Sequence, residues 1–195
     1  MAAKIEILNR TIVSESYGRL EHVQLRRRRF DARDQDLDRE IYDIGNSAAI
    51  FLYDPTRGVI LLIKQFRLPV FLAMGRDATI EVCAGKLEGM DPAERIVAEA
   101  REETGLHIGA PRFLFAAFLS PGAYCEKMSF FAAAYSEADR KSAGGGLADE
   151  GEDIKVFETS LDEALAMVDR GEIIDAKTIL LLNYAKRTGL TGVRD

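Results

Sequence analysis

The sequence predicts a fold that mixes α-helices and β-strands. Two strongly apolar runs, 47–54 and 58–66, flank the turn sequence PTRG and indicate a hairpin of buried strands. Residues 92–104 carry the signals of a helix, with Pro92 in the first turn and Gly105 just past the last turn. Apolar residues make up 47% of the chain, which is enough for a real core in a chain of 195 residues.

The N-terminal segments read as strands with one well solvated face. Residues 4–13 alternate loosely between apolar and polar, and residues 19–28 place a few apolar side chains among basic ones. The arginine run at 26–29 is typical of a solvated surface. The polar segment 30–38 (FDARDQDLD) predicts a loop or hairpin, after which REIYDIG begins a third strand.

The remaining elements follow in order along the chain. After the hairpin, 68–78 predicts a loop, and TIEVCAG predicts a short strand that ends at Gly85. Beyond the helix at 92–104, the expected elements are strands at 111–118 and 127–135, a mobile glycine-rich acidic loop at 136–153, a strand in DIKVFET, and helices at 160–170 and 175–188. Ser160 with Glu163 three residues later is a capping-box pattern for the first of these helices.

Composition excludes several classes of function. The net charge is −6, with 32 acidic and 26 basic residues, which argues against a protein that grips nucleic acid through a basic surface. The two cysteines, Cys83 and Cys125, cannot form a disulfide framework or a four-cysteine zinc site, and read as small buried side chains. With His22 and His107 the only histidines, a metal site would be built from carboxylates and would suit a hard cation.

The expected location is the cytoplasm. No apolar run is long enough to cross a membrane, and the first ten residues lack the apolar core of a signal peptide. We therefore expect a soluble protein of a reducing compartment, without a membrane partner.

The helix at 92–104 carries an acidic face. Glu99, Glu102 and Glu103 stand at i, i+3 and i+4, so their carboxylates crowd together and repel unless a cation lies among them. Such a pattern is usually just a solvated face. Here the helix follows a strand end, a tight turn at Ala84–Gly85 and a glycine-containing loop, where backbone groups are free to face a ligand.

The segment 85–106, GKLEGMDPAERIVAEAREETGL, resembles the Nudix box, whose family hydrolyses nucleoside diphosphates linked to another moiety with the help of divalent metals. Gly85, Glu99, the Glu102–Glu103 pair and Gly105 match the motif. The sequence departs from it in three ways. The box is one residue short, Asp91 stands in the place of its early glutamate, and Ala98 stands in the place of its arginine.

The missing box arginine removes a structural ion pair of the family. Arg95 lies one helical turn before Glu99, and we hypothesise that it supplies a substitute charge.

The resemblance covers nearly the whole chain and is to the nucleotide-sugar pyrophosphatase branch of the family. It implies an α/β/α sandwich with a mixed central sheet at 45–195 and an N-terminal antiparallel β subdomain at 1–44, exchanged across a homodimer with partly shared sites. The stretches REIYDIGN, IKQFR and GEIIDAKTILLLNY, and the short box, resemble enzymes that cleave GDP-mannose to GMP and mannose 1-phosphate. The alternatives are an ADP-ribose or ADP-sugar pyrophosphatase and a silent nucleotide-sensing domain. The intact E-x-x-E-E argues against the latter.

The resemblance also implies a metal site. It would hold two or three Mg²⁺ ions, which Mn²⁺ could replace, through the backbone carbonyl of Ala84 and the side chains of Glu99, Glu103 and Glu152, with Glu102 close by. Glu150 is an alternative to Glu152, because the acidic loop carries extra residues. The general base could be Glu152, Glu150 or a helix glutamate such as Glu102, and the sequence does not choose among them.

The residues implied to contact substrate are Tyr17, Arg39, Glu40, Arg67, Ala84, Gly85, Glu126 and Lys177. Of these, Tyr17, Arg39 and Glu40 match positions that reach the nucleotide partly from the partner subunit. Glu40 would suit guanine, which offers two adjacent donors where adenine does not. Apart from the resemblance, Lys177 could be a solvated lysine and Tyr17 a buried structural residue.

Overall fold

The computed structural model describes residues 5–147, 149 and 151–191. The chain divides into two compact units, Met1–Asn46 with Phe118–Lys127 and Ser47–Ala117 with Met128–Asp195. Within the described ranges, no helix is both long and apolar enough to cross a membrane.

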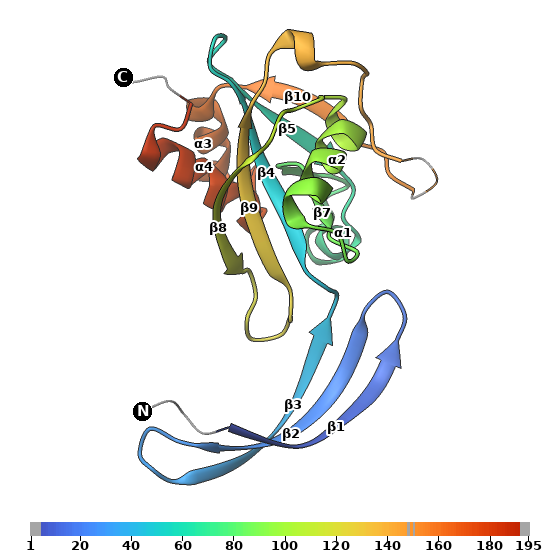
Figure 1. The fold of residues 1–195 in the computed structure, drawn as a ribbon, viewed down its shortest axis with the longest axis vertical. Helices are drawn as coiled ribbons and strands as arrows, with labels where there is room; N and C mark the ends of the chain where they lie inside the picture. The colour runs from blue at the N-terminus through green and yellow to red at the C-terminus, as the bar shows by residue number, and fades with distance from the viewer. Residues whose placement is uncertain (1–4, 148, 150, 192–195) are drawn as a thin grey trace. The chain divides into compact units, whose positions relative to one another are not determined.

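The first unit is built on an antiparallel sheet of β1 (Ile5–Glu15), β2 (Arg19–Arg28) and β3 (Asp34–Asp43), with β2 in the centre (Figure 1). The prediction of a loop at 30–38 is wrong for residues 34–38, because β3 already begins at Asp34. Asp36 stands opposite Arg26 with an ion pair of 2.7 Å, and Asp34 stands opposite Arg28. These cross-strand charge pairs make a strand of a segment that looks like a loop by composition alone.

The second unit holds a mixed sheet covered by helices. Its strands are β4 (Ser47–Asp54), β5 (Val59–Gln65), β6 (Thr79–Glu81), β7 (Ala84–Lys86), β8 (Arg112–Phe118), β9 (Lys127–Ala134) and β10 (Lys155–Thr159). Its helices are α1 (Leu68–Met74), α2 (Pro92–Thr104), α3 (Leu161–Asp169) and α4 (Ala176–Thr188), with a short 3-10 helix η1 (Glu137–Asp139). The sheet runs β10-β5-β4-β9-β8, with β6 paired to β5 and β7 paired to β4.

The central strand of this sheet is buried on both faces. β4 runs parallel to β9 and antiparallel to β5, and nearly all of its side chains are buried. Figure 1 shows α2 on one side of the sheet and α3 with α4 on the other. Continuous apolar runs, rather than alternating ones, are what such a doubly covered strand requires. The predicted hairpin around PTRG and the α/β/α arrangement are confirmed.

Two short segments differ from the prediction. The segment 68–78, expected as a loop, contains α1, which has Pro69 in its first turn and ends at Gly75 in the left-handed region. The strand expected in TIEVCAG is two strands, since the chain leaves β5 after Glu81 and joins β4 at Ala84. Between them the amide of Val82 donates to the hydroxyl of Thr178, which ties this crossing to α4.

Candidate active site

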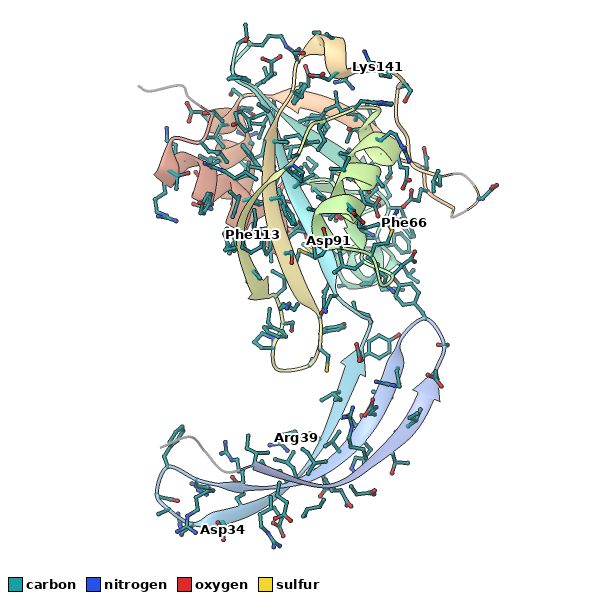
Figure 2. The ribbon with its side chains drawn as sticks, viewed as in Figure 1. Asp34, Arg39, Phe66, Asp91, Phe113 and Lys141 are labelled. Atoms are coloured by element: carbon teal, nitrogen blue, oxygen red, sulfur yellow. The ribbon has the colours of Figure 1, made fainter. Side chains whose placement is uncertain are left out.

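Helix α2 begins and ends where the sequence predicts. The Asp91 carboxylate accepts hydrogen bonds from the amides of Ala93 and Glu94, at 2.8 Å and 3.3 Å, and Figure 2 shows it at the start of the helix. Gly105 ends the helix in the left-handed conformation. Asp91, which replaces the early glutamate of the box, therefore serves as the N-cap of the helix.

Gly85 is required because the Glu99 carboxylate lies against the backbone of β7. A Cβ atom on Gly85 would lie 1.5 Å from Oε1 of Glu99, so no other residue fits without moving that carboxylate. Glu99 is itself buried. The first glycine of the box and its first helical glutamate thus form one packed unit.

Arg95 fills the electrostatic role left open by Ala98. Its Nη2 lies 2.6 Å from Oε1 of Glu99, and its Nη1 lies 3.4 Å from Oε2 of Glu102. Its Nε donates to the carbonyl of Lys86 in β7 at 3.1 Å, so the same side chain also connects the helix to the strand. The hypothesis of a substitute charge is confirmed.

Glu103 is a buried carboxylate that lies close to other carboxylates. It is 2% exposed and accepts hydrogen bonds from the Ala84 amide at 3.2 Å and from the Cys83 thiol. Burial raises the pKa of Glu103 to about 8, and the charges of Glu99 and Glu152 add to the rise against the two hydrogen bonds. Burial likewise raises the pKa of Cys83, first through desolvation, so this thiol is a poor nucleophile, as expected.

The glycine-rich loop is fastened to the end of α2. The amides of Gly145 and Gly146 donate to the carbonyls of Glu103 and Glu102, at 2.9 Å and 3.2 Å. A Cβ on Gly146 would lie 2.4 Å from Oε2 of Glu152, and that oxygen accepts from the Leu147 amide at 2.9 Å. The glycines let the loop pass close to the helix, and Glu152 lies within electrostatic reach of Glu103. The expected mobility of the loop stays a prediction.

Two predicted ligand contacts, Arg67 and Lys177, are joined by Glu81, which was not among the residues predicted from sequence. The Nε and Nη2 atoms of Arg67 each donate to the Glu81 carboxylate at 2.9 Å, and Nζ of Lys177 donates to it at 2.5 Å. Lys177 is 7% exposed, so the solvated-lysine interpretation is wrong. The sequence did contain a signal for this role, because Glu81 is a single acidic residue within the apolar strand sequence TIEV.

The pKa of Glu81 falls to about 2. Burial alone would raise it, but the hydrogen bonds from Arg67 and the charge of Lys177 outweigh desolvation. Desolvation also opposes the charge on Lys177, yet the Glu81 and Asp175 carboxylates keep the pKa of this lysine above its usual value.

The other predicted contacts lie in the first unit. Arg39, labelled in Figure 2, lies on β3 with its Nη1 donating to the Asp38 carbonyl at 2.7 Å, and Glu40 stands opposite His22. Tyr17 is 75% exposed, so the alternative of a buried structural role is wrong. The substrate contacts proposed for these residues and for Glu126 stay predictions.

The described donors fit a hard cation. Glu99, Glu102, Glu103 and Glu152 offer only carboxylate oxygens, which Mg²⁺ prefers, and the buried Glu103 lies beside like charges. In the part of the chain that the structure describes, no three acidic, histidine or cysteine side chains form a ready metal cage. Glu150, the alternative ligand, lies outside the described residues.

Known proteins resemble the chain along almost all of its length. A GDP-mannose pyrophosphatase from Citrobacter koseri is 40% identical over 191 residues, covering 97% of this chain and 99% of the relative. The enzyme of that name from Escherichia coli gives the same figures. The chain belongs to the GDP-mannose pyrophosphatase family of Nudix hydrolases.

The fold agrees with this family membership. A crystal structure of an ADP compounds hydrolase superposes with a TM-score of 0.71, at 19% identity and over 97% of this chain and 95% of the other. No family model matches the chain. In this member of the GDP-mannose pyrophosphatase family, Gly85 packs against the Glu99 carboxylate, and Arg95 forms an ion pair with it.

Proposed function

We propose that this protein hydrolyses the diphosphate bond of GDP-mannose to give GMP and mannose 1-phosphate in a Mg²⁺-dependent reaction. The observation that carries the proposal is the buried Glu103, crowded by Glu99 and Glu152 behind the Gly85 turn. Such a group of carboxylates is costly in a purely structural role and is suited to a divalent cation that a diphosphate also binds. The names of the relatives supply the substrate.

Each residue then has a distinct task. Glu99, Glu103, Glu152 and the carbonyl of Ala84 would hold the metal ions. Bound Mg²⁺ neutralises charge on the diphosphate and activates the attacking water. Arg67 would bind the diphosphate through Nη1, since Nε and Nη2 are engaged by Glu81. Glu152, oriented by the Leu147 amide, is our choice for the base that takes the proton of water, with Glu150 as the alternative.

We propose that the enzyme acts as a homodimer in the cytoplasm. The first unit exposes apolar side chains that a partner could cover, including Ile5, Ile7, Leu8, Ile12 and Val13 of β1, each about half exposed. In such a dimer Tyr17, Arg39 and Glu40 would reach the partner's nucleotide. The two free cysteines suit a reducing compartment.

The direct experiment is a substrate panel. Purified protein is incubated with GDP-mannose, GDP-glucose, ADP-ribose and ADP-glucose, with Mg²⁺ or with EDTA, and the nucleotide products are identified. We expect GMP from GDP-mannose, at a rate that EDTA abolishes. A clear preference for ADP-ribose would move the assignment to the ADP-sugar pyrophosphatases. Turnover of none of these substrates, with nucleotide binding still visible as a thermal shift, would point to a sensor.

Base recognition has its own test at Glu40. The Glu40→Gln variant replaces an acceptor suited to the two donors of guanine, so we expect the ratio of kcat/KM for GDP-mannose over ADP-mannose to shrink by about tenfold or more. The measurement is that ratio in wild type and variant. An unchanged ratio means that Glu40 does not read the base.

A further inference from the structure

Glu81 occupies a position where a carboxylate is costly. It ends β6, stands opposite the fully buried Ile63 of β5, and is 2% exposed. The following residue, Val82, is fully buried as well. Moving an ionised carboxylate into such surroundings costs several kcal/mol, and a well-packed apolar residue often gives the same or better stability. A structural role alone is therefore a weak reason for this glutamate.

The Glu81 carboxylate fixes the orientation of Arg67. Its two oxygens accept from Nε and Nη2 of the guanidinium at 2.9 Å each, a geometry that locks the plane of the group. The Arg67 side chain is 43% exposed, whereas the carboxylate that holds it is buried. The pair thus reaches from the core to the surface and leaves Nη1 for another anion.

Arg67 is also influenced by the charge of Glu103 on α2. Desolvation opposes its charge, but the Glu81 carboxylate and then the charge of Glu103 favour it and raise the pKa of Arg67. The guanidinium therefore lies within electrostatic reach of a candidate metal ligand. An anion that binds metal ions at Glu103 can meet Arg67 as well.

Lys177 binds the same carboxylate, at the Oε2 atom that also accepts from Nη2 of Arg67. Its Nζ lies 2.5 Å from Oε2 of Glu81 and 3.0 Å from Oδ1 of Asp175, the N-cap of α4. The hydroxyl of Thr178 donates to Asp175 and accepts from the Val82 amide, next to Glu81 in the chain. The start of α4 is thereby fixed to the strand that carries Glu81.

We propose that Glu81 is a positioning residue for the reaction, which fixes the guanidinium of Arg67 against the substrate diphosphate, with Lys177 as its brace. This inference rests on the proposed function and adds a residue to it. Glutamine cannot replace Glu81, because an amide has a single acceptor oxygen and would turn its NH₂ group toward Arg67 or Lys177. Arg67 would then sample several orientations. Small misplacements of a binding group can lower the reaction rate strongly.

A double-mutant cycle tests whether Glu81 acts through Arg67. Wild type, Glu81→Gln, Arg67→Ala and the double variant are compared for kcat and KM on GDP-mannose with Mg²⁺. We expect Glu81→Gln to lower kcat/KM by about 10- to 100-fold, with a raised KM, and to cost less than about threefold once Arg67 is alanine. Equal losses in both backgrounds, or no loss in the first, would overturn the proposal.

A matched control separates positioning from stability. Glu158 is also a strand glutamate between two arginines, Arg57 and Arg140, and it lies outside the candidate site. We expect Glu158→Gln to lower the urea midpoint but to leave KM unchanged. A KM change as large as that of Glu81→Gln would mean that both report general loss of structure. Should Glu81→Gln not fold, Glu81→Asp, which keeps the charge and withdraws it by one methylene, takes its place in the cycle with the same expected coupling.

Pyrophosphate binding keeps the inference separate from the proposed function. Calorimetry with inorganic pyrophosphate and Mg²⁺ measures the anion site without any turnover. We expect Glu81→Gln to weaken binding about as much as Arg67→Ala does. If the panel of nucleotide sugars shows no cleavage, the proposed function fails, and this measurement still decides the role of Glu81. Unchanged affinity in Glu81→Gln, or no binding by the wild type, would overturn the inference.

Discussion

Glu81 and Glu103 are equally buried, and their carboxylates behave in opposite ways. Each is 2% exposed, yet the pKa of Glu81 falls to about 2 and that of Glu103 rises to about 8. Burial raises the pKa of both. Glu81 has Arg67 and Lys177 to offset it, whereas Glu103 has an amide, a thiol and neighbouring carboxylates. Burial therefore does not decide the charge of a carboxylate here. The groups around it do: two cations for Glu81, and an amide, a thiol and like charges for Glu103.

Replacing Glu103 should have the largest effect. Glu103→Gln removes a proposed metal ligand, and we expect kcat with Mg²⁺ to fall at least about 1000-fold. In EDTA the same variant should be at least as stable as wild type, since glutamine abolishes a charge that the metal-free site disfavours. Steady-state rates and urea unfolding in EDTA at pH 8 measure the two effects. A variant that loses stability along with activity would contradict the comparison.

The lowered pKa of Glu81 predicts that the protein loses stability in acid. The lowered pKa of Glu81 gives stability that is present above its ordinary value of 4.5 and is lost as the pH falls toward about 2, on the order of 3 kcal/mol. Urea unfolding at pH 6 and pH 3 should show about 2 kcal/mol of this loss in wild type and a smaller loss in Glu81→Gln. Glu94→Gln, at an exposed position, is the control. If Glu81→Gln and wild type lose the same free energy of unfolding, the acid sensitivity does not come from Glu81.

A methyl group at Gly85 should displace the carboxylate of Glu99. In Gly85→Ala the added Cβ meets Oε1 of Glu99, so the carboxylate must move away from β7. We expect activity to fall by about 100-fold and stability by about 2 kcal/mol. Gly109→Ala is the matched control, because a Cβ there meets nothing within 4 Å. Activity near wild type in Gly85→Ala would mean that the position of Glu99 is unimportant.

The smallest effect is expected at Arg95. Arg95→Met removes the cation beside Glu99 and Glu102 and makes their surroundings more like those of Glu103. We expect a loss of about 1 kcal/mol in the free energy of unfolding and about tenfold in kcat/KM, as for residues that orient metal ligands. Added Mg²⁺ should restore part of the stability, which urea unfolding with and without the metal would detect. No recovery would argue that Arg95 acts only as packing.

The parts of the fold that local sequence determines were predictable. Pro92 and Gly105 mark both ends of α2, and the spacing of Glu99, Glu102 and Glu103 places them on one face before any tertiary contact forms. The short α1 was missed because its sequence, LPVFLAM, is apolar throughout and so shows no helical periodicity, although none of its residues is buried. The start of β3 was missed because its acids make sense only beside the arginines of β2.

The network around Glu81 could not be read from local sequence. Its partners Arg67 and Lys177 are 14 and 96 residues away, and only the folded sheet brings them together. The attachment of the glycine-rich loop to α2 could not be predicted either, because the two segments are far apart in the sequence. The sequence contained the glycines and the acids, but it did not show which helix carbonyls they would meet.

That loop is closed at its base by Leu147 and Glu152. The Leu147 amide donates to Oε2 of Glu152 at 2.9 Å, and the Glu152 amide donates back to the Leu147 carbonyl at 3.3 Å. With the ends held together, doubling the number of residues between them costs only about 0.6 kcal/mol of chain entropy. Insertions between these two anchors are thus inexpensive. We therefore expect a short peptide inserted between them to leave the hydrogen bonds between Leu147 and Glu152 in place.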